Sequence, residues 1–162
     1  MPKAIPDGYA ILTPYLVVSD AKKAIEFYKK AFGAKEVMRM PCPETGKIMH
    51  AEMDAFGSRF MLADQNEFCG KMKYNEPGKL GGTAVMIHVY VQDCDKAFKQ
   101  AVSAGAEAVR PLEDQFYGDR NGTLRDPFGH LWGISTHKKD LTPEQLEKGM
   151  KEAMEKMKAG AA

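Results

Sequence analysis

An internal repeat constrains this chain more than any other feature of its sequence. Residues 15–24, YLVVSDAKKA, match residues 88–97, HVYVQDCDKA, at one constant offset. In each copy an apolar run typical of a strand leads into a helix, and in the first copy Ser19 or Asp20 can cap that helix. A unit that occurs only twice indicates duplication within one fold, because solenoids need at least three stacked units.

The first copy opens a unit of one strand, one helix and three further strands. We expect the strands over residues 11–18, 37–40, 47–55 and 59–64. The helix after the first strand has apolar residues at a spacing of three to four and ends at Gly33. Residues 56–58 are expected to form the turn of a hairpin. The first module is therefore placed over residues 9–66.

The second copy opens the same succession of elements over residues 83–138. Its helix is expected to end at Gly105, and its later strands to cover residues 108–110, 122–125 and 131–136. The stretch 114–137, DQFYGDRNGTLRDPFGHLWGISTH, contains turn-forming residues at 119–122 and at 126–129. Trp132, in the closing strand, is expected to fill the core because tryptophan buries a large apolar area.

Two further segments lie outside the repeated units. Residues 67–82 carry Asn, Gly, Pro and Lys without periodicity, which predicts a linker loop longer than compact domains usually contain. Residues 139–162 are expected to form a helical extension with Thr142 as its N-cap, Pro143 in the first turn and Gln145 completing a capping box. Its apolar stripe consists of Leu146, Met150, Ala153, Met154 and Met157. We expect this stripe to dock onto its own domain; binding to a partner is the alternative.

Composition argues against several classes of protein. With 162 residues and 44% apolar content, the chain is expected to fold as one compact domain or two fused small ones. The net charge of +1 and the lack of basic runs interleaved with aromatic residues argue against a nucleic-acid partner. The sequence has no apolar span suited to a membrane and no apolar centre near its start, which predicts a cytoplasmic protein without a membrane partner. Its three cysteines contain no CxxC pair and are expected to be reduced thiols.

Several separated motifs resemble the vicinal oxygen chelate superfamily, also called the glyoxalase, bleomycin-resistance and dioxygenase group. They are the repeated strand-helix-strand units, FYKKAFGAKEV at residues 27–37, and above all the stretch 114–137. Within this superfamily the chain is similar to the PhnB-like subgroup. The resemblance implies an α+β fold of paired βαβββ modules whose curved sheets enclose a cavity, commonly in a homodimer, with the C-terminal helix added. It is more specific for fold than for activity, since one fold carries many functions.

The resemblance implies a small-molecule ligand and leaves two main classes of function open. The first is a glyoxalase-like lyase or isomerase that polarises a carbonyl group or moves a proton. The second is a non-catalytic protein that sequesters a drug-like molecule or metabolite in the same cavity, as bleomycin-resistance proteins do. A structural or partner-binding role is the third alternative.

The resemblance also implies where a metal would bind, on the first and last strands of each module. Local matching puts these positions at Thr13, Leu62, Met86 and Gly133. A divalent metal in an isomerase or dioxygenase needs several His, Asp or Glu donors around an open position, which these residues do not supply. The usual ligand set is therefore not found, and the sequence leaves the cofactor undetermined.

Other polar residues on the expected cavity face are candidates for catalysis. His50 and Glu52 share one face of their strand, and alternation places His88 on the cavity face of the first strand of the second module. We interpret His50, Glu52 and His88 as a candidate acid-base or displaced metal site, because imidazole and carboxylate groups act both as ligands and as proton carriers. The alternative is that they are ordinary half-buried strand residues with hydrogen-bonded partners.

A second set of residues is expected to contact the ligand. Alternation brings two tyrosines to the cavity face, and a tyrosine and an arginine in a loop at the cavity rim could meet an anionic substrate. These residues are Tyr15, Tyr90, Tyr117 and Arg120. For Arg120 the favoured alternative is structural: with Asp119, Arg125 and Asp126 it would hold the turns together by charge-assisted hydrogen bonds.

Overall fold

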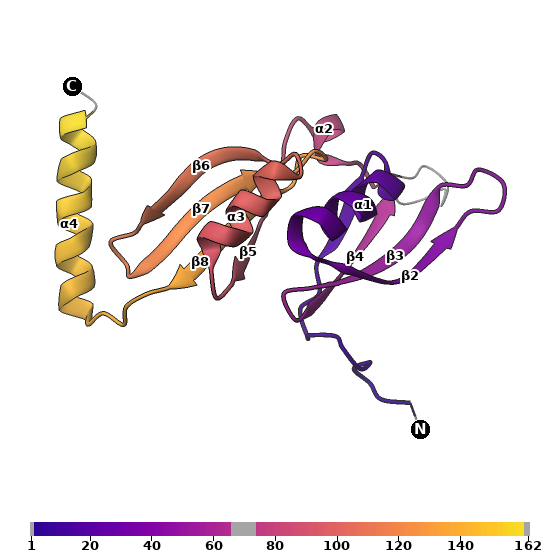
Figure 1. Ribbon diagram of the computed structural model, residues 1–162, viewed down its shortest axis with the longest axis horizontal. Helices are drawn as coiled ribbons and strands as arrows, with labels where there is room; N and C mark the ends of the chain where they lie inside the picture. The colour runs from indigo at the N-terminus through magenta and orange to yellow at the C-terminus, as the bar shows by residue number, and fades with distance from the viewer. Residues whose placement is uncertain (1, 66–73, 161–162) are drawn as a thin grey trace.

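The structure is a computed structural model that describes residues 2–65 and 74–160, and it contains two successive βαβββ units and a C-terminal helix (Figure 1). The first unit consists of β1 (Tyr15–Val18), α1 (Ala21–Phe32), β2 (Lys35–Pro41), β3 (Ile48–Ala55) and β4 (Ser58–Asp64). The short helix α2 (Pro77–Leu80) precedes the second unit, which consists of β5 (Met86–Tyr90), α3 (Cys94–Ser103), β6 (Glu107–Asp114), β7 (Asp119–Arg125) and β8 (Leu131–His137). The helix α4 (Pro143–Gly160) follows. The predicted α+β class and paired modules are confirmed.

Each unit forms one four-stranded mixed sheet, and the two sheets have the same topology. The strand orders are β1-β4-β3-β2 and β5-β8-β7-β6. In both sheets the first strand pairs in parallel with the last, whereas the remaining pairs are antiparallel. The repeated sequence therefore corresponds to a repeated sheet.

The two long helices of the units begin at the aspartates of the repeat. The carboxylate of Asp20 accepts a hydrogen bond from Lys23 N at 3.0 Å, and that of Asp93 accepts one from Lys96 N at 2.9 Å. Each bond satisfies a backbone N–H that has no partner inside the helix. Gly33 ends α1 in the left-handed conformation, with φ 62°, as the sequence predicted.

The second unit corrects the predicted positions of one turn and several strand ends. β6 covers Glu107–Asp114 instead of 108–110, and residues 119–122, predicted to form a turn, belong to β7. The hairpin turns at residues 115–118, where Gly118 has φ 96°. Asp119 and Asn121 are buried with hydrogen-bonding partners inside the sheet, which offsets the low strand preference of these residue types.

The first strand and the linker also differ from prediction. β1 begins at Tyr15, not at residue 11, and Ile11 and Leu12 are exposed ahead of it. The expected linker contains the helix α2, which Glu76 caps by accepting bonds from Gly78 N and Lys79 N. Residues 66–73 of the segment lie outside the described residues. So does Cys69, whereas Cys42 and Cys94 are free thiols.

One hydrophobic core joins the two units. Tyr28 of α1 and Trp132 of β8 lie with their ring centroids 5.7 Å apart, and Trp132 is 2% exposed, as predicted. Both donate a hydrogen bond to Oδ2 of the buried Asp126, at 2.7 and 2.9 Å. The other oxygen of Asp126 accepts bonds from the backbone N–H groups of Phe128 and His130. This carboxylate therefore fixes its own turn and ties the second unit to the first.

The C-terminal helix has the predicted cap but stands apart from both sheets (Figure 1). Thr142 N donates to Gln145 Oε1 at 2.8 Å, and Gln145 N donates to Thr142 Oγ1 at 3.3 Å, which completes the capping box. None of the helices in the described ranges is both long and apolar enough for a membrane crossing.

The predicted docking of the apolar stripe onto its own domain is wrong for the single chain. The exposed fraction is 45% at Met150, 53% at Met154 and 72% at Met157. Only the start of α4 approaches the second unit, where Gly149 faces Phe116 in the β6–β7 turn. The segment after β8 carries the helix beyond the edge of the sheet, so most of the stripe has no surface of its own chain to cover.

Candidate functional site

Each sheet has one face covered by its helix and one face that no helix of the described residues covers, which we call the open face. In the first unit α1 packs over Leu16, Met53 and Leu62, so alternation directs Tyr15, His50, Glu52, Arg59 and Met61 to the first open face. In the second unit the same alternation directs Met86, His88, Tyr90, Asp119, Asn121, Gly133 and Ser135 to the second open face. The two units meet mainly through α1 and α3, so these faces lie outside the contact between units.

His50 lies at the centre of a cluster on the first open face. Its Nε2 is 3.5 Å from Glu52 Oε1, and its Nδ1 is 3.4 Å from the Tyr15 hydroxyl. Arg59 Nη1 lies 3.6 Å from the other oxygen of Glu52. The pKa of Glu52 is lowered. The nearby Tyr9 hydroxyl is the largest cause, and burial of the carboxylate acts in the opposite direction. The cluster thus places an imidazole between a phenol and an ionised carboxylate.

The second open face carries a tighter network around Asp119, which is 5% exposed. The Tyr90 hydroxyl donates to Asp119 Oδ2 at 2.7 Å, and His137 Nδ1 lies 2.7 Å from Oδ1. Burial acts to raise the pKa of Asp119, but the bonds from His137 and Tyr90 outweigh it and the pKa is lowered. The pKa of His137 is raised, first by Asp119 and then by Asp140, whose Oδ1 lies 3.0 Å from His137 Nε2. His137 is therefore held between two carboxylates.

Two further contacts shape the second open face. Asn121 Nδ2 donates to Ser135 Oγ at 2.6 Å, and its Oδ1 accepts a bond from the Arg110 guanidinium. His88 lies over Gly133, because a Cβ at that glycine would be 2.6 Å from His88 Nδ1. Only a residue without a side chain leaves room for the imidazole in this position.

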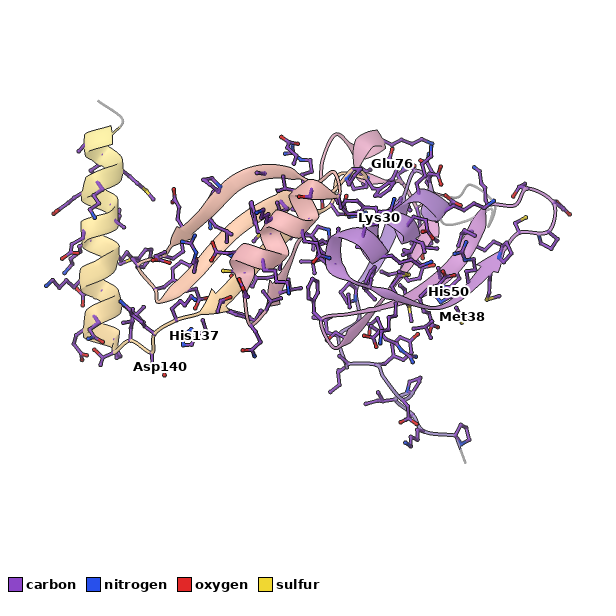
Figure 2. All side chains as sticks on the ribbon, in the orientation of Figure 1. Lys30, Met38, His50, Glu76, His137 and Asp140 are labelled. Carbon is purple, nitrogen blue, oxygen red and sulfur yellow. The ribbon has the colours of Figure 1, made fainter. Side chains whose placement is uncertain are left out.

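The structure divides the predicted catalytic residues between the two units. His50 and Glu52 are neighbours on the first open face, whereas His88 lies on the second, with its ring centroid 5.1 Å from that of Tyr90. Figure 2 shows His50 on the first unit and His137 far from it on the second. Within the described ranges no group of three or more His, Cys, Asp or Glu side chains is arranged to hold a metal ion. One chain therefore does not gather His50, Glu52 and His88 as metal ligands.

The four predicted ligand-binding residues do not lie together in the single chain. Tyr15 and Tyr90 lie on the open faces and are 48% and 62% exposed. Tyr117 lies in the β6–β7 turn and is 36% exposed. Arg120 points toward the helix side, where it donates to both oxygens of Asp95 in α3 at 2.7 and 2.9 Å. This geometry favours the structural alternative for Arg120, since a bidentate ion pair fixes α3 on β7.

Sheet register corrects one of the four positions matched to metal ligands. Tyr15 pairs with Met61, and His88 pairs with Gly133, so Met61 is the counterpart of Gly133. Leu62 is fully buried and packs against α1, because adjacent residues of a strand point to opposite faces. Neither Leu62 nor Met61 adds the oxygen or nitrogen donors that a divalent metal requires, so this set does not fit a metal.

Reasoning from the sequence missed Asp119, Asn121, Ser135 and His137 as parts of a site. The turn predicted over residues 119–122 includes Asp119 and Asn121, and His137 lies one residue beyond the strand predicted over residues 131–136. Extending the strand alternation backward from the buried Leu124 would have placed Asp119 and Asn121 on the face opposite to that leucine. Turn-forming residue types concealed this signal.

Paired four-stranded βαβββ units with uncovered sheet faces define a two-module α+β protein. The family model of the Glyoxalase/Bleomycin resistance protein/Dioxygenase superfamily matches residues 10–134. The chain therefore belongs to this superfamily, and α4 lies beyond the matched range.

Similar proteins agree with this assignment. The Uncharacterized protein Rv0887c of Mycobacterium tuberculosis is 44% identical over 140 residues, which cover 86% of this chain and 81% of that protein. The crystal structure of TioX from Micromonospora sp. ML1 superposes with a TM-score of 0.63 and 30% sequence identity. The match covers 79% of this chain and 98% of the TioX chain. A Bacillus cereus structure described as a putative 3-demethylubiquinone-9 3-methyltransferase, PhnB protein, is 20% identical, with a TM-score of 0.59 and coverage of 78% and 99%. The last likeness concerns the fold alone.

Proposed function

We propose that this protein is a glyoxalase-like small-molecule protein that binds a small carbonyl-containing or drug-like ligand against its open faces. One observation carries the proposal: large side chains stand exposed on these faces beside hydrogen-bonding groups. Tyr15, Met86 and Tyr90 are 48%, 48% and 62% exposed, with His50 and His88 next to the tyrosines. Ligand sites combine such apolar and aromatic surface with a few polar groups.

Binding without catalysis is the function that the geometry supports best. On the second open face both oxygens of Asp119 are engaged, and His137 is held between Asp119 and Asp140. The matched metal positions do not supply a ligand set, so no metal-dependent step enters the proposal. The enzymatic alternative rests on His50, which lies between Tyr15 and Glu52 and could move a proton there.

We further propose that a second copy of the chain completes the site, with the open faces of two copies turned toward each other across a two-fold axis. In the single chain no helix of the described residues covers these faces, and β1 and β5 are edge strands of their sheets. Edge strands and apolar faces need covering, and isologous pairing is the commonest way to cover them.

A thermal-shift screen with carbonyl compounds and drug-like aromatic molecules tests the proposed function. A ligand that binds the native state must raise the melting temperature. We expect Tyr15→Ala and Tyr90→Ala to reduce the shift, while Lys99→Met, an exposed change on α3, leaves it unchanged. A shift that survives both tyrosine substitutions would place the ligand elsewhere. Recovery of unchanged ligand supports binding, whereas turnover that His50→Ala abolishes would favour the enzymatic alternative.

A further inference from the structure

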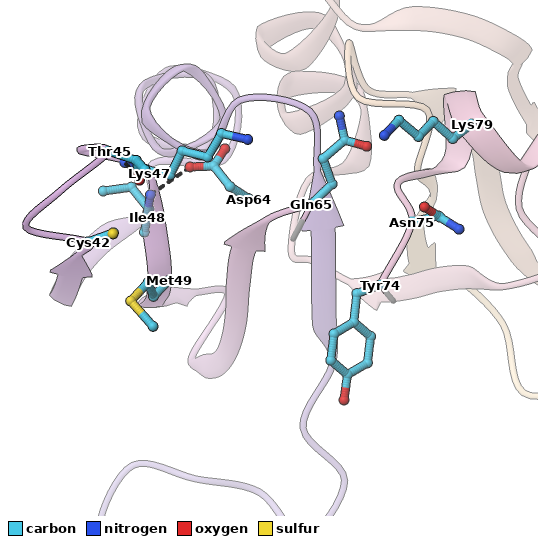
Figure 3. Close-up of a pocket in the computed structure, with 10 residues that line it drawn as sticks. All are labelled: Cys42, Thr45, Lys47, Ile48, Met49, Asp64, Gln65, Tyr74, Asn75 and Lys79. Carbon is cyan, nitrogen blue, oxygen red and sulfur yellow. Dashed lines mark hydrogen bonds between the residues drawn. The ribbon is translucent and has the colours of Figure 1, made fainter. Parts of the chain in front are cut away.

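A cavity of about 320 Å³ lies at the end of the first sheet, where β4 stops and β3 begins (Figure 3). Its walls come from the β2–β3 turn, the adjoining ends of β3 and β4, and the segment 74–79. The cavity shares no lining residue with the His50 or Asp119 clusters, so the proposed function leaves it unexplained.

Two lysines give this cavity a positive character. Lys47 from the β2–β3 turn and Lys79 from α2 point toward one another in Figure 3, and neither has an ion-pair partner in the described part of the chain. Asp64 is the one acidic residue among the described lining residues, and it is already engaged: its Oδ1 accepts from Ala21 N at 2.7 Å and its Oδ2 from Ile48 N at 2.6 Å. With two positive groups and one negative group, the described part of the lining has a positive balance.

The remaining walls combine apolar surface with hydrogen-bonding groups. Ile48, Met49 and Tyr74 provide the apolar part, and Met49 and Tyr74 are 41% and 49% exposed. Gln65 lies between the two lysines in Figure 3, and its Oε1 is enclosed without a hydrogen-bond partner among the described residues. An enclosed polar atom without a partner is costly, and rotation of this amide would present two N–H donors to a ligand.

We propose that this cavity binds a small organic anion, with its carboxylate between Lys47 and Lys79 and a compact apolar body against Ile48, Met49 and Tyr74. Ammonium groups form charge-assisted hydrogen bonds with carboxylates, which are stronger than bonds between neutral groups. The apolar wall adds burial that an inorganic ion could not use. The described lining shares no residue with the His50 and Asp119 clusters, and the proposal does not depend on the function proposed for the open faces.

Cys42 offers a local measure of occupancy, because this residue lines the same cavity and is 7% exposed. A ligand in the cavity should slow alkylation of this thiol. Peptide mass spectrometry after iodoacetamide treatment measures Cys42 separately from the other cysteines.

The probes are benzoate and its neutral counterpart of similar size, benzamide, tested by titration calorimetry and by Cys42 labelling. We expect benzoate to bind and to slow the labelling, and benzamide to bind at least about tenfold more weakly, as expected for loss of a charged hydrogen bond. Lys47→Met and Lys79→Met should each weaken benzoate binding about tenfold. Lys47→Arg should retain most of the binding. Lys99→Met, an exposed change of equal charge on α3, is the matched control and should leave binding unaltered.

Equal binding of benzoate and benzamide would overturn the proposal, as would benzoate binding that survives both lysine-to-methionine substitutions. Failure of the wild type to bind millimolar benzoate would overturn it as well. Equal protection of Cys42 by inorganic phosphate would overturn the assignment to an organic anion. Each variant's melting temperature shows that it is folded, and none of these outcomes depends on a ligand at the open faces.

Discussion

The two βαβββ units share one topology but differ in how much of their surface is covered. Helix α1 buries seven of its residues, whereas α3 buries only Cys94 and Ala101. The open faces differ as well: Tyr15 and Met61 in the first unit correspond by register to His88 and Gly133 in the second. Duplication therefore preserved the backbone, while side chains on the uncovered faces diverged because core packing does not constrain them.

The polar groups on these faces also differ in how tightly they are held. Around His50 the contacts are 3.4 to 3.5 Å long, whereas those of Asp119 with Tyr90 and His137 are 2.7 Å. The first face thus keeps an imidazole with loose contacts, and the second keeps a closed network. Under the proposed function, this contrast favours the first face for the enzymatic alternative and the second for recognition of a ligand.

The largest expected effect concerns Asp126, whose carboxylate joins the second unit to the first; we call its hydrogen bonds the joint. Asp126→Ala would leave four donors without their acceptor, namely the Tyr28 hydroxyl, Trp132 Nε1 and the backbone N–H groups of Phe128 and His130. We expect the free energy of unfolding to fall by about 3 kcal/mol or more, since unsatisfied buried donors are costly. Urea unfolding followed by tryptophan fluorescence and by far-UV circular dichroism measures the effect.

The matched control for this joint is Asp114→Ala, whose side chain is 81% exposed. We expect it to change stability by less than about 1 kcal/mol, as is usual for exposed ion pairs. If Asp126→Ala were no more destabilising than the control, the two units would not depend on a common joint.

A smaller effect should separate the two open faces directly. Gly133→Ala would place a Cβ 2.6 Å from His88 Nδ1 and displace the imidazole, at a cost of about 1–3 kcal/mol. In the His88→Ala background most of this cost should vanish, because the clash is gone. Met61→Ala at the corresponding position of the first unit removes atoms and creates no clash. Thermal unfolding of the single and double variants measures the coupling, and additive effects would show that His88 does not rest on Gly133.

Two residues, His137 on the second face and Glu52 on the first, should respond to pH with opposite sign. His137 has a raised pKa in the fold, so its contribution is fully present below its ordinary value of 6.5 and is lost as the pH rises through the raised value. Glu52 has a lowered pKa, so its contribution is present above its ordinary value of 4.5 and is lost as the pH falls through the lowered value. His137→Gln should remove the alkaline loss of stability and Glu52→Gln part of the acid loss. Urea unfolding over a pH series measures both, and unchanged pH profiles in the variants would contradict these assignments.

The smallest expected effect on the stability of either unit is that of removing α4. Because the exposed stripe covers little of its own chain, deletion of residues 142–162 should change the melting temperature of the monomeric body by only a few degrees, within the range of a change of about 1 kcal/mol. Its larger effect is expected on assembly, if the stripe lies over the partner in the proposed homodimer. Analytical ultracentrifugation at micromolar concentration is the measurement. A monomeric intact chain would refute the dimer, and an equally stable truncated dimer would exclude α4 from the interface.

Local features of the sequence determined much of the fold. The repeat at residues 15–24 and 88–97 predicted two like units, and the topology of both sheets agrees. Gly33 and the pair Thr142 and Gln145 mark helix ends where they were expected, and Trp132 is buried. These features are readable because a cap, a turn or a period involves residues only a few positions apart.

The tertiary structure decided the features that join distant residues. It placed Asp119 in a strand and Leu62 against α1, left the α4 stripe uncovered, and joined Tyr28 to Asp126 across 98 positions of the chain. Whether a polar residue forms a turn or pairs inside a sheet depends on partners that only the packed sheet supplies. Strand register then assigns each side chain to one face, and a shift of one residue reverses that assignment. The periodicity of a strand or helix can therefore be recognised from neighbouring residues in the sequence, whereas the partner of each side chain is fixed only when the sheets and helices pack together.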